Sequence, residues 1–243
     1  MKSVQILVAL AGLLLARRAR AQVDPFEFEV YPYHTVGAGV AELESLNSFV
    51  AKGHTEGDSG LSSGDLPSDL MYRTAFELTY GLTDKIEAAA YLNLAHPNGE
   101  AFRYAGSKFR LRGSLFEQGE LPVDLGWYVE LEWHKTPQFD GTELELEFKP
   151  LIEKDIGRFE VDVNPIFEKA LNGEEQHLGV EFGYAAALYY NYWRELSPGV
   201  EFYGGIGLID DADPLTSSST TSSRCCAGSC RTGWSTTSAP ALA

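Results

Sequence analysis

Hydrophobic and polar residues alternate with a period of two along most of this 243-residue chain. Clear examples are the stretches FEFEV at 26–30, WYVELEW at 127–133 and ELELEF at 143–148. Successive side chains of a β-strand point to opposite faces of the sheet. Each stretch therefore predicts a strand with one apolar or aromatic face and one acidic face.

The same pattern predicts about ten strands within residues 22–215, which we interpret as one domain. The expected strands are 26–31, 40–49, 72–80, 86–95, 108–117, 123–134, 143–153, 159–167, 177–192 and 200–208. Several approach the length of about nine to eleven residues that a tilted membrane-spanning strand needs.

The expected connections alternate between short and long. Short turns are predicted at 81–85, 118–122, 154–158 and 196–199, and longer polar loops at 53–69, 96–106, 135–142 and 172–176. Outer-membrane barrels have short turns on the periplasmic side and longer loops outside. We therefore expect an all-β fold, an antiparallel up-and-down transmembrane β-barrel with about ten strands present.

Aromatic residues flank the apolar faces of the expected strands. Tyr72 and Tyr80 bound the apolar face of the strand at 72–80, and Trp127 and Trp133 lie on that of 123–134. Aromatic girdles around an apolar band are typical of the lipid–water interface. We predict these four residues to lie there. In a soluble β-sandwich the same faces would form a core, and this alternative stays open.

The polar faces of the expected strands would line the barrel interior. The candidate interior residues are Glu77, Glu87, Lys108, Arg110, Arg112, Glu130, Glu132, Glu145, Glu147, Glu160, Asp162 and Glu181, together with Glu27, Glu29, Glu143 and Glu201. Because a buried, unpaired carboxylate is costly, the interior must hold water or the acids must pair with the basic residues. The pattern fits a narrow, cation-preferring passage. It fits equally a packed, non-conducting interior held by salt bridges.

The first 21 residues have the order of an export signal: Lys2, an apolar run at 4–16, and Ala19-Arg20-Ala21 before a predicted cleavage site. A retained N-terminal anchor is the alternative. No later stretch has 18 consecutive apolar residues, so we expect no membrane-spanning helix after residue 21. Cleavage would leave 15 of the 19 basic residues against all 35 acidic ones, a net charge near −20.

This charge argues against nucleic acid as a partner and favours cations wherever carboxylates share an enclosed space. The five histidines, His34, His54, His96, His134 and His177, lack metal-ligand spacing, and no GxSxG, HExxH or phosphate-binding glycine loop is present. We therefore predict no enzymatic activity, no cofactor and no metal. The nearest catalytic candidate is Asp58-Ser59 beside His54. Polar residues are common in loops, and this explains the three residues better than a catalytic role does.

Four stretches carry a resemblance to a known family. YGLTDKIEAAAYLNL at 80–94, LRGSLFEQGELPVDLGWYVELEW at 111–133, EKDIGRFEVDVNPIFEK at 153–169 and ELSPGVEFYGGIG at 195–207 resemble outer-membrane barrels of the MetA-pathway phenol-degradation type. The likeness spans most of residues 26–209. It implies a porin-like protein, or one that passes hydrophobic compounds, and offers no catalytic motif.

The tail, residues 216–243, breaks the pattern, with no acidic residue and all three cysteines, Cys225, Cys226 and Cys230. A natural Ser/Thr linker is one interpretation, and a zinc site lacks the CxxC pairing it would need. Our hypothesis is a shifted reading frame after Leu215. Shifted codons can read HEQQHYIFPVLRG over 216–228 and LEYNVGP over 234–240, which would supply further strands and suit twelve in the intact form.

Together these features predict a porin-like protein of the cell outer membrane, reached by Sec-type export, that passes small solutes. Its expected partners are outer-membrane lipid, the barrel-assembly machinery and periplasmic chaperones. The solute itself is not specified by the sequence. An exported soluble β-protein that binds a ligand or partner is the alternative from another class.

Overall fold

The computed structural model describes residues 24, 26–53, 55, 67–135, 144–193, 196–211 and 220–221, and all its strands belong to a single antiparallel sheet. Each strand pairs with the next one along the chain, from β1 to β10. The strands are β1 (Ala41–Phe49), β2 (Tyr72–Thr83), β3 (Ile86–His96), β4 (Arg103–Ser114), β5 (Asp124–His134), β6 (Leu144–Ile156), β7 (Phe159–Ala170), β8 (Glu181–Tyr190), β9 (Gly199–Leu208) and β10 (Thr220–Thr221). Two short 3₁₀ turns, η1 (Glu174–His177) and η2 (Ile209–Asp211), complete the elements. The predicted all-β, up-and-down architecture is confirmed.

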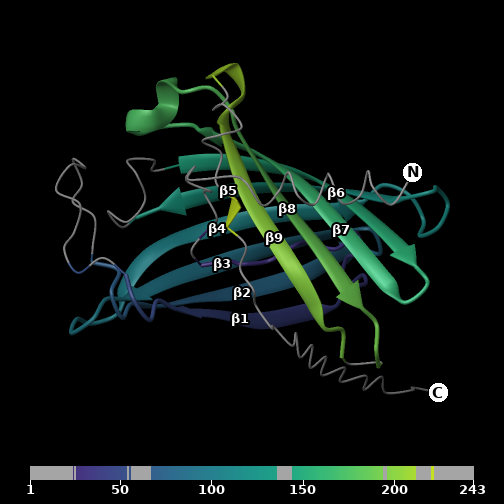
Figure 1. Ribbon diagram of the computed structural model, residues 1–243, viewed down its shortest axis with the longest axis horizontal. Coiled ribbons are helices and arrows are strands. Elements are labelled where there is room, and N and C mark those ends of the chain that lie inside the picture. The colour runs from purple at the N-terminus through teal and green to yellow at the C-terminus, as the bar shows by residue number, and fades with distance from the viewer. Residues whose placement is uncertain are drawn as a thin grey trace, which may run out of the picture.

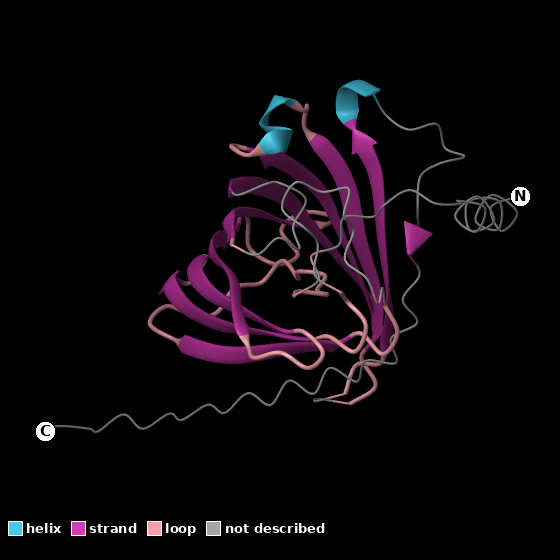
Figure 2. Ribbon diagram, turned by 90° about the vertical axis from the view of Figure 1, so that its left-hand side faces the viewer, coloured by secondary structure: helices cyan, strands magenta, loops and turns pink. Residues whose placement is uncertain are grey.

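The sheet curls into an open trough (Figures 1 and 2). β1 lies at one edge, and at the other edge β9 pairs only with the two residues of β10. β1 and β9 do not pair, so within the described residues the sheet does not close. This is the shape of an incomplete barrel, as expected if strands after β9 are missing.

One predicted strand is wrong. Residues 26–31 belong to no strand and instead cross the concave face of the sheet, with Phe26, Val30 and Tyr31 buried. Their alternation arises because successive side chains contact different parts of the trough wall. The predicted strand at 177–192 also begins later, at Glu181, because His177 belongs to η1. The tenth strand of the sheet is Thr220–Thr221, which the pattern did not predict.

The connections alternate only in part. Two of the predicted short turns are tight, but the connections after β4 (115–123) and β8 (191–198) are longer than predicted, and residues 103–106 of the predicted loop at 96–106 belong to β4. The turns Asp84–Lys85 and Gly157–Arg158 are tight, and Gly157 adopts a φ of 68°, a left-handed conformation that glycine reaches without strain. In an up-and-down sheet, alternate connections lie at the same end. The tight turns therefore share one end of the trough, the turn end, and the connections after β1, β3, β5 and β7 share the other, the loop end.

Among the described residues, no helix is long and apolar enough to cross a membrane. The predicted export signal at 1–21, most of the tail at 216–243, Glu143, and the candidate residues His54, Asp58 and Ser59 lie outside the described residues. The predictions made for them therefore stay predictions.

Candidate functional interior

Charged side chains are buried on the concave face of the sheet, and apolar side chains are exposed on the convex face. Strand β4 illustrates the pattern: Lys108 and Arg110 are 2% and 3% exposed, whereas Phe109 between them is 61% exposed. Water-soluble proteins show the opposite distribution. In the described part of the sheet, the distribution of charged and apolar side chains is therefore the reverse of that in a water-soluble protein.

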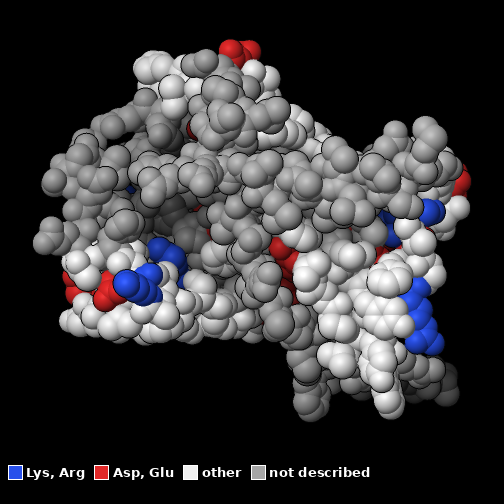
Figure 3. Space-filling view, viewed as in Figure 1, with Lys and Arg blue, Asp and Glu red and all other residues white. Residues whose placement is uncertain are grey.

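The convex face carries a continuous apolar surface across the strands. Its exposed members include Leu43, Phe76, Leu78, Tyr80, Leu92, Phe109, Leu111, Leu131, Trp133, Leu146, Phe148, Phe159, Val163, Leu188, Val200 and Phe202. In Figure 3 most of the described atoms in view are neither acidic nor basic; charged side chains show at the left and right, with an acidic patch near the centre. No second layer of strands covers this face within the described residues.

The four predicted interface aromatics all belong to this face by parity. Tyr80 and Trp133 are exposed, at 48% and 54%. Tyr72 and Trp127 are half-buried: Tyr72 donates a hydrogen bond to Asn47 of β1, and the Trp127 ring packs over Gly113, where a Cβ would meet it at 2.8 Å.

Twelve of the predicted interior residues lie on the concave side of their strands. Buried among them are Glu77, Glu87, Lys108, Arg110, Arg112, Glu130 and Asp162. Half-buried are Glu132, Glu145, Glu147, Glu160 and Glu181. Additional residues that face the same space, Asp124, Lys149 and Glu153, were not among the candidates although their parity would have identified them.

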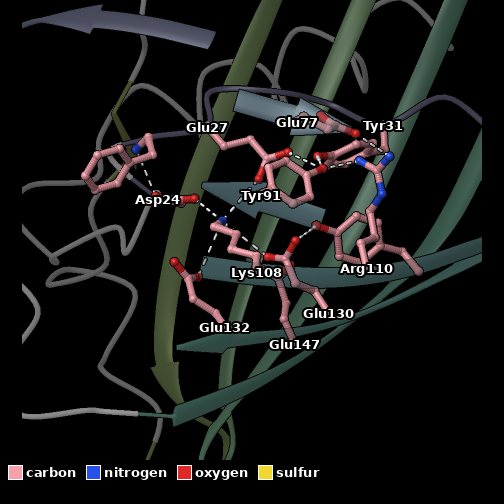
Figure 4. Close-up of polar contacts among 12 residues, drawn as sticks. Asp24, Glu27, Tyr31, Glu77, Tyr91, Lys108, Arg110, Glu130, Glu132 and Glu147 are labelled. Atoms are coloured by element: carbon pink, nitrogen blue, oxygen red, sulfur yellow. Dashed lines mark hydrogen bonds and ion pairs between the residues drawn. The ribbon is translucent and has the colours of Figure 1, made fainter. Parts of the chain in front are cut away.

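Lys108 of β4 is the centre of one ion cluster (Figure 4). Its Nζ atom pairs with Asp24, with Glu27 Oε2 at 3.1 Å, with Glu130 Oε1 at 3.2 Å and with Glu132 Oε2 at 3.4 Å. We call these five residues the Lys108 cluster. One cation thus faces four carboxyl groups, so acidic side chains outnumber the single cation in this cluster.

Arg110 and Arg112 form a second group with the acids of β2 and β3. Arg110 Nη2 lies 2.5 Å from Glu77 Oε1 and 3.1 Å from Glu87 Oε1, and Arg112 Nη2 lies 2.7 Å from Glu87 Oε1. These charge-assisted contacts supply the partners that buried carboxylates require. The predicted pairing of acidic residues with the basic strand is therefore present in this part of the interior, with two acids against two arginines.

Tyrosine rings separate the two ion groups. The rings of Tyr31 and Tyr128 lie 4.8 Å apart, and the Arg110 guanidinium lies 5.1 Å from the Tyr31 centroid and 5.4 Å from that of Tyr91. Lys149 of β6 sits 4.5 Å from the Tyr128 ring centre and 2.7 Å from Glu147 Oε1. Cation–π contacts of this kind are strongest where the cation is desolvated.

The segment before β1, residues 24–36, fills the trough. Phe26 packs against Ala75, Ala95 and Ala105 of β2, β3 and β4, and Val30 packs against β8 and β9. The Tyr31 amide donates to Asn164 Oδ1 of β7 at 2.7 Å, and Asn164 Nδ2 donates to the Tyr31 carbonyl at 3.0 Å. We call residues 24–36 the N-terminal segment. It joins the opposite walls of the open sheet.

Sequence reasoning missed this segment, although a signal was available. Pro25 and Pro32 flank the alternating stretch, and proline lacks the N–H that a central strand must donate. A stretch with proline at both ends is a poor member of a closed barrel. The candidate interior residues Glu27 and Glu29 belong to the segment itself and not to the barrel wall.

Two groups of acids are close enough to share a metal ion, among the residues described. In Glu27, Glu29 and Glu77, and again in Glu153, Glu160 and Asp162, one ligand atom of each residue lies within 4.8 Å of the others. The first group already has Lys108 and Arg110 as partners. These two cations balance part of the charge of the first group.

The described interior is more acidic than basic. Seven acidic side chains are buried, Glu27, Glu77, Glu87, Asp124, Glu130, Glu153 and Asp162, against four basic ones, Lys108, Arg110, Arg112 and Lys149. Such an excess favours cations over anions in an enclosed, water-filled space.

Comparison of the chain with protein-family models, with curated proteins and with solved structures finds no match.

Proposed function

We propose that this chain is a porin-like protein of the outer membrane, whose barrel passes small solutes and prefers cations. The observation that carries the proposal is the inverted distribution of side chains. Phe109, Leu78 and Trp133 are each more than half exposed on the convex face, while the charged side chains are buried on the concave face. A lipid environment outside and a polar space inside account for both.

An exported soluble β-protein would need something to cover the apolar face, since monomeric soluble proteins rarely expose large contiguous apolar patches. The lengths of β2 to β9, which run from 10 to 13 residues, also suit strands that cross a bilayer at a tilt. The resemblance to MetA-pathway outer-membrane barrels agrees with this proposal.

The proposal includes an intact form with more strands than the sheet now holds. Lipid does not tolerate an open sheet edge, and bacterial barrels have even strand numbers. Thr220–Thr221 pairs antiparallel to β9 at Gly204 and Tyr203, where a full tenth strand would lie. A shifted frame after Leu215, if corrected, would supply that strand and continue toward β1.

Ion preference is the property to measure. In a planar bilayer with a KCl gradient across it, the reconstituted full chain should give a reversal potential of the sign expected for cations. Glu145 and Glu160 are half-buried on the concave face. Glu145 Oε2 lies 3.5 Å from His134 Nε2, and Asn191 donates to Glu160 Oε2 at 3.5 Å. Neutralising both (Glu145→Gln with Glu160→Gln) should therefore move the reversal potential toward zero.

The control is Glu120→Gln, at an exposed carboxylate of the β4–β5 connection. It should leave the reversal potential close to that of the parent. Anion preference in the parent, or an equal shift in the control, would refute the proposed role of the acidic interior.

A further inference from the structure

We propose that the N-terminal segment, residues 24–36, is an internal plug that closes the passage through this protein's own barrel. The inference rests on the proposed function, since a plug is meaningful only if a passage exists. It concerns regulation of that passage by a part of the chain that forms no strand.

The segment runs the whole length of the trough. Phe26 contacts Ala75, Ala95 and Ala105, which lie at the loop end of β2, β3 and β4. Farther along, the Val36 amide donates to Glu87 Oε2 at 2.8 Å, and Ala38 donates to Asp84 in the β2–β3 turn. The backbone therefore enters at the loop end and leaves at the turn end, where β1 begins.

Its anchors come from almost every strand of the wall. Besides the contacts with β2, β3 and β4, Tyr31 packs against Tyr128 of β5 and Leu151 of β6. Val30 packs against Ala185 and Ala187 of β8 and Tyr203 of β9, and Asn164 of β7 holds the Tyr31 backbone. A segment that contacts every strand from β2 to β9 on the concave face leaves little room for a solute to pass between these strands.

The anchoring is apolar as well as ionic. Val30 and Tyr31 are 3% and 2% exposed, and both lie on the trough wall, whereas Phe28 of the same segment is 49% exposed. Asp24 and Glu27 add ion pairs to Lys108. Replacing the two buried anchors should therefore release the segment without altering any strand.

The test compares four forms of the full-length protein in planar bilayers: the parent, Val30→Asp with Tyr31→Ser, the control Phe28→Ser, and a deletion of residues 24–36. Heat-modifiable migration on gels first shows that each form has folded. Limited proteolysis with mass spectrometry then shows whether residues 24–36 are accessible.

We expect the Val30/Tyr31 double variant to become cleavable within 24–36 and to conduct several-fold more than the parent. The deletion should conduct at the same raised level, and Phe28→Ser should behave as the parent does. If residues 24–36 become cleavable but conductance stays at the parent level, the plug is refuted and the proposed porin function is not. Folded forms that never conduct, deletion included, would overturn the proposed function together with the plug.

Discussion

Replacing Lys108 with methionine should be among the most destabilising single changes in this protein. Methionine has a similar length and no charge, so the variant leaves Asp24, Glu27 and Glu130 without the cation that they share. Removing one partner of a buried ion group costs roughly 3–5 kcal/mol, because the remaining charges stay desolvated. Since Asp24 and Glu27 belong to the N-terminal segment, part of this loss should be the undocking of that segment.

The measurement is the free energy of unfolding in urea, followed by tryptophan fluorescence in detergent micelles. Lys85→Met is the matched control: Lys85 pairs with Glu117 at 2.6 Å, but both side chains are exposed, at 43% and 76%. Exposed pairs contribute little, so this variant should unfold close to the parent. A second change, Glu130→Gln, should restore part of the stability lost in Lys108→Met by removing one unpaired charge. Equal effects of the two lysine variants would show that the Lys108 cluster is not buried.

The second large effect should come from Phe109→Arg, on the convex face at the middle of β4. If this face contacts lipid, an arginine at the bilayer midplane costs about 2–4 kcal/mol, which falls to about 0–1 near the interfaces. If the face contacts water, an exposed phenylalanine at 61% can become arginine with almost no cost. The two environments therefore predict clearly different results for one substitution.

The folded fraction after refolding into lipid vesicles, read from heat-modifiable migration at increasing urea, separates these cases. Leu115→Arg is the control, since Leu115 is 53% exposed but lies in the connection after β4. We expect Phe109→Arg to fold at a lower yield and to unfold at lower urea than Leu115→Arg. Similar curves for both would place the convex face in water.

Much of the wall of this fold follows from local patterns. The period-two alternation identified nine of the strands, and parity alone placed Glu77, Lys108 and Glu130 on the polar side. The face of a strand residue depends only on its position within the strand, so it can be read from the sequence without knowledge of neighbours.

The contents of the trough could not be read in this way. Whether Lys108 pairs with Asp24, or Asn164 with the Tyr31 backbone, depends on how the sheet curves and on where residues 24–36 lie inside it. These partners are separated by 84 and 133 positions along the chain. The alternation at 26–31 was misassigned because packing against two walls produces the same pattern as a strand. In the sequence, only Pro25 and Pro32 distinguish such a packed segment from a strand.

The location of the chain in the cell is the most direct test of the whole account. Cells that produce the full-length chain should be lysed and separated into soluble periplasm, inner membrane and outer membrane on a density gradient. The proposal predicts recovery in the outer-membrane fraction, resistant to carbonate extraction and heat-modifiable on gels. Recovery in the soluble periplasm without detergent would contradict it.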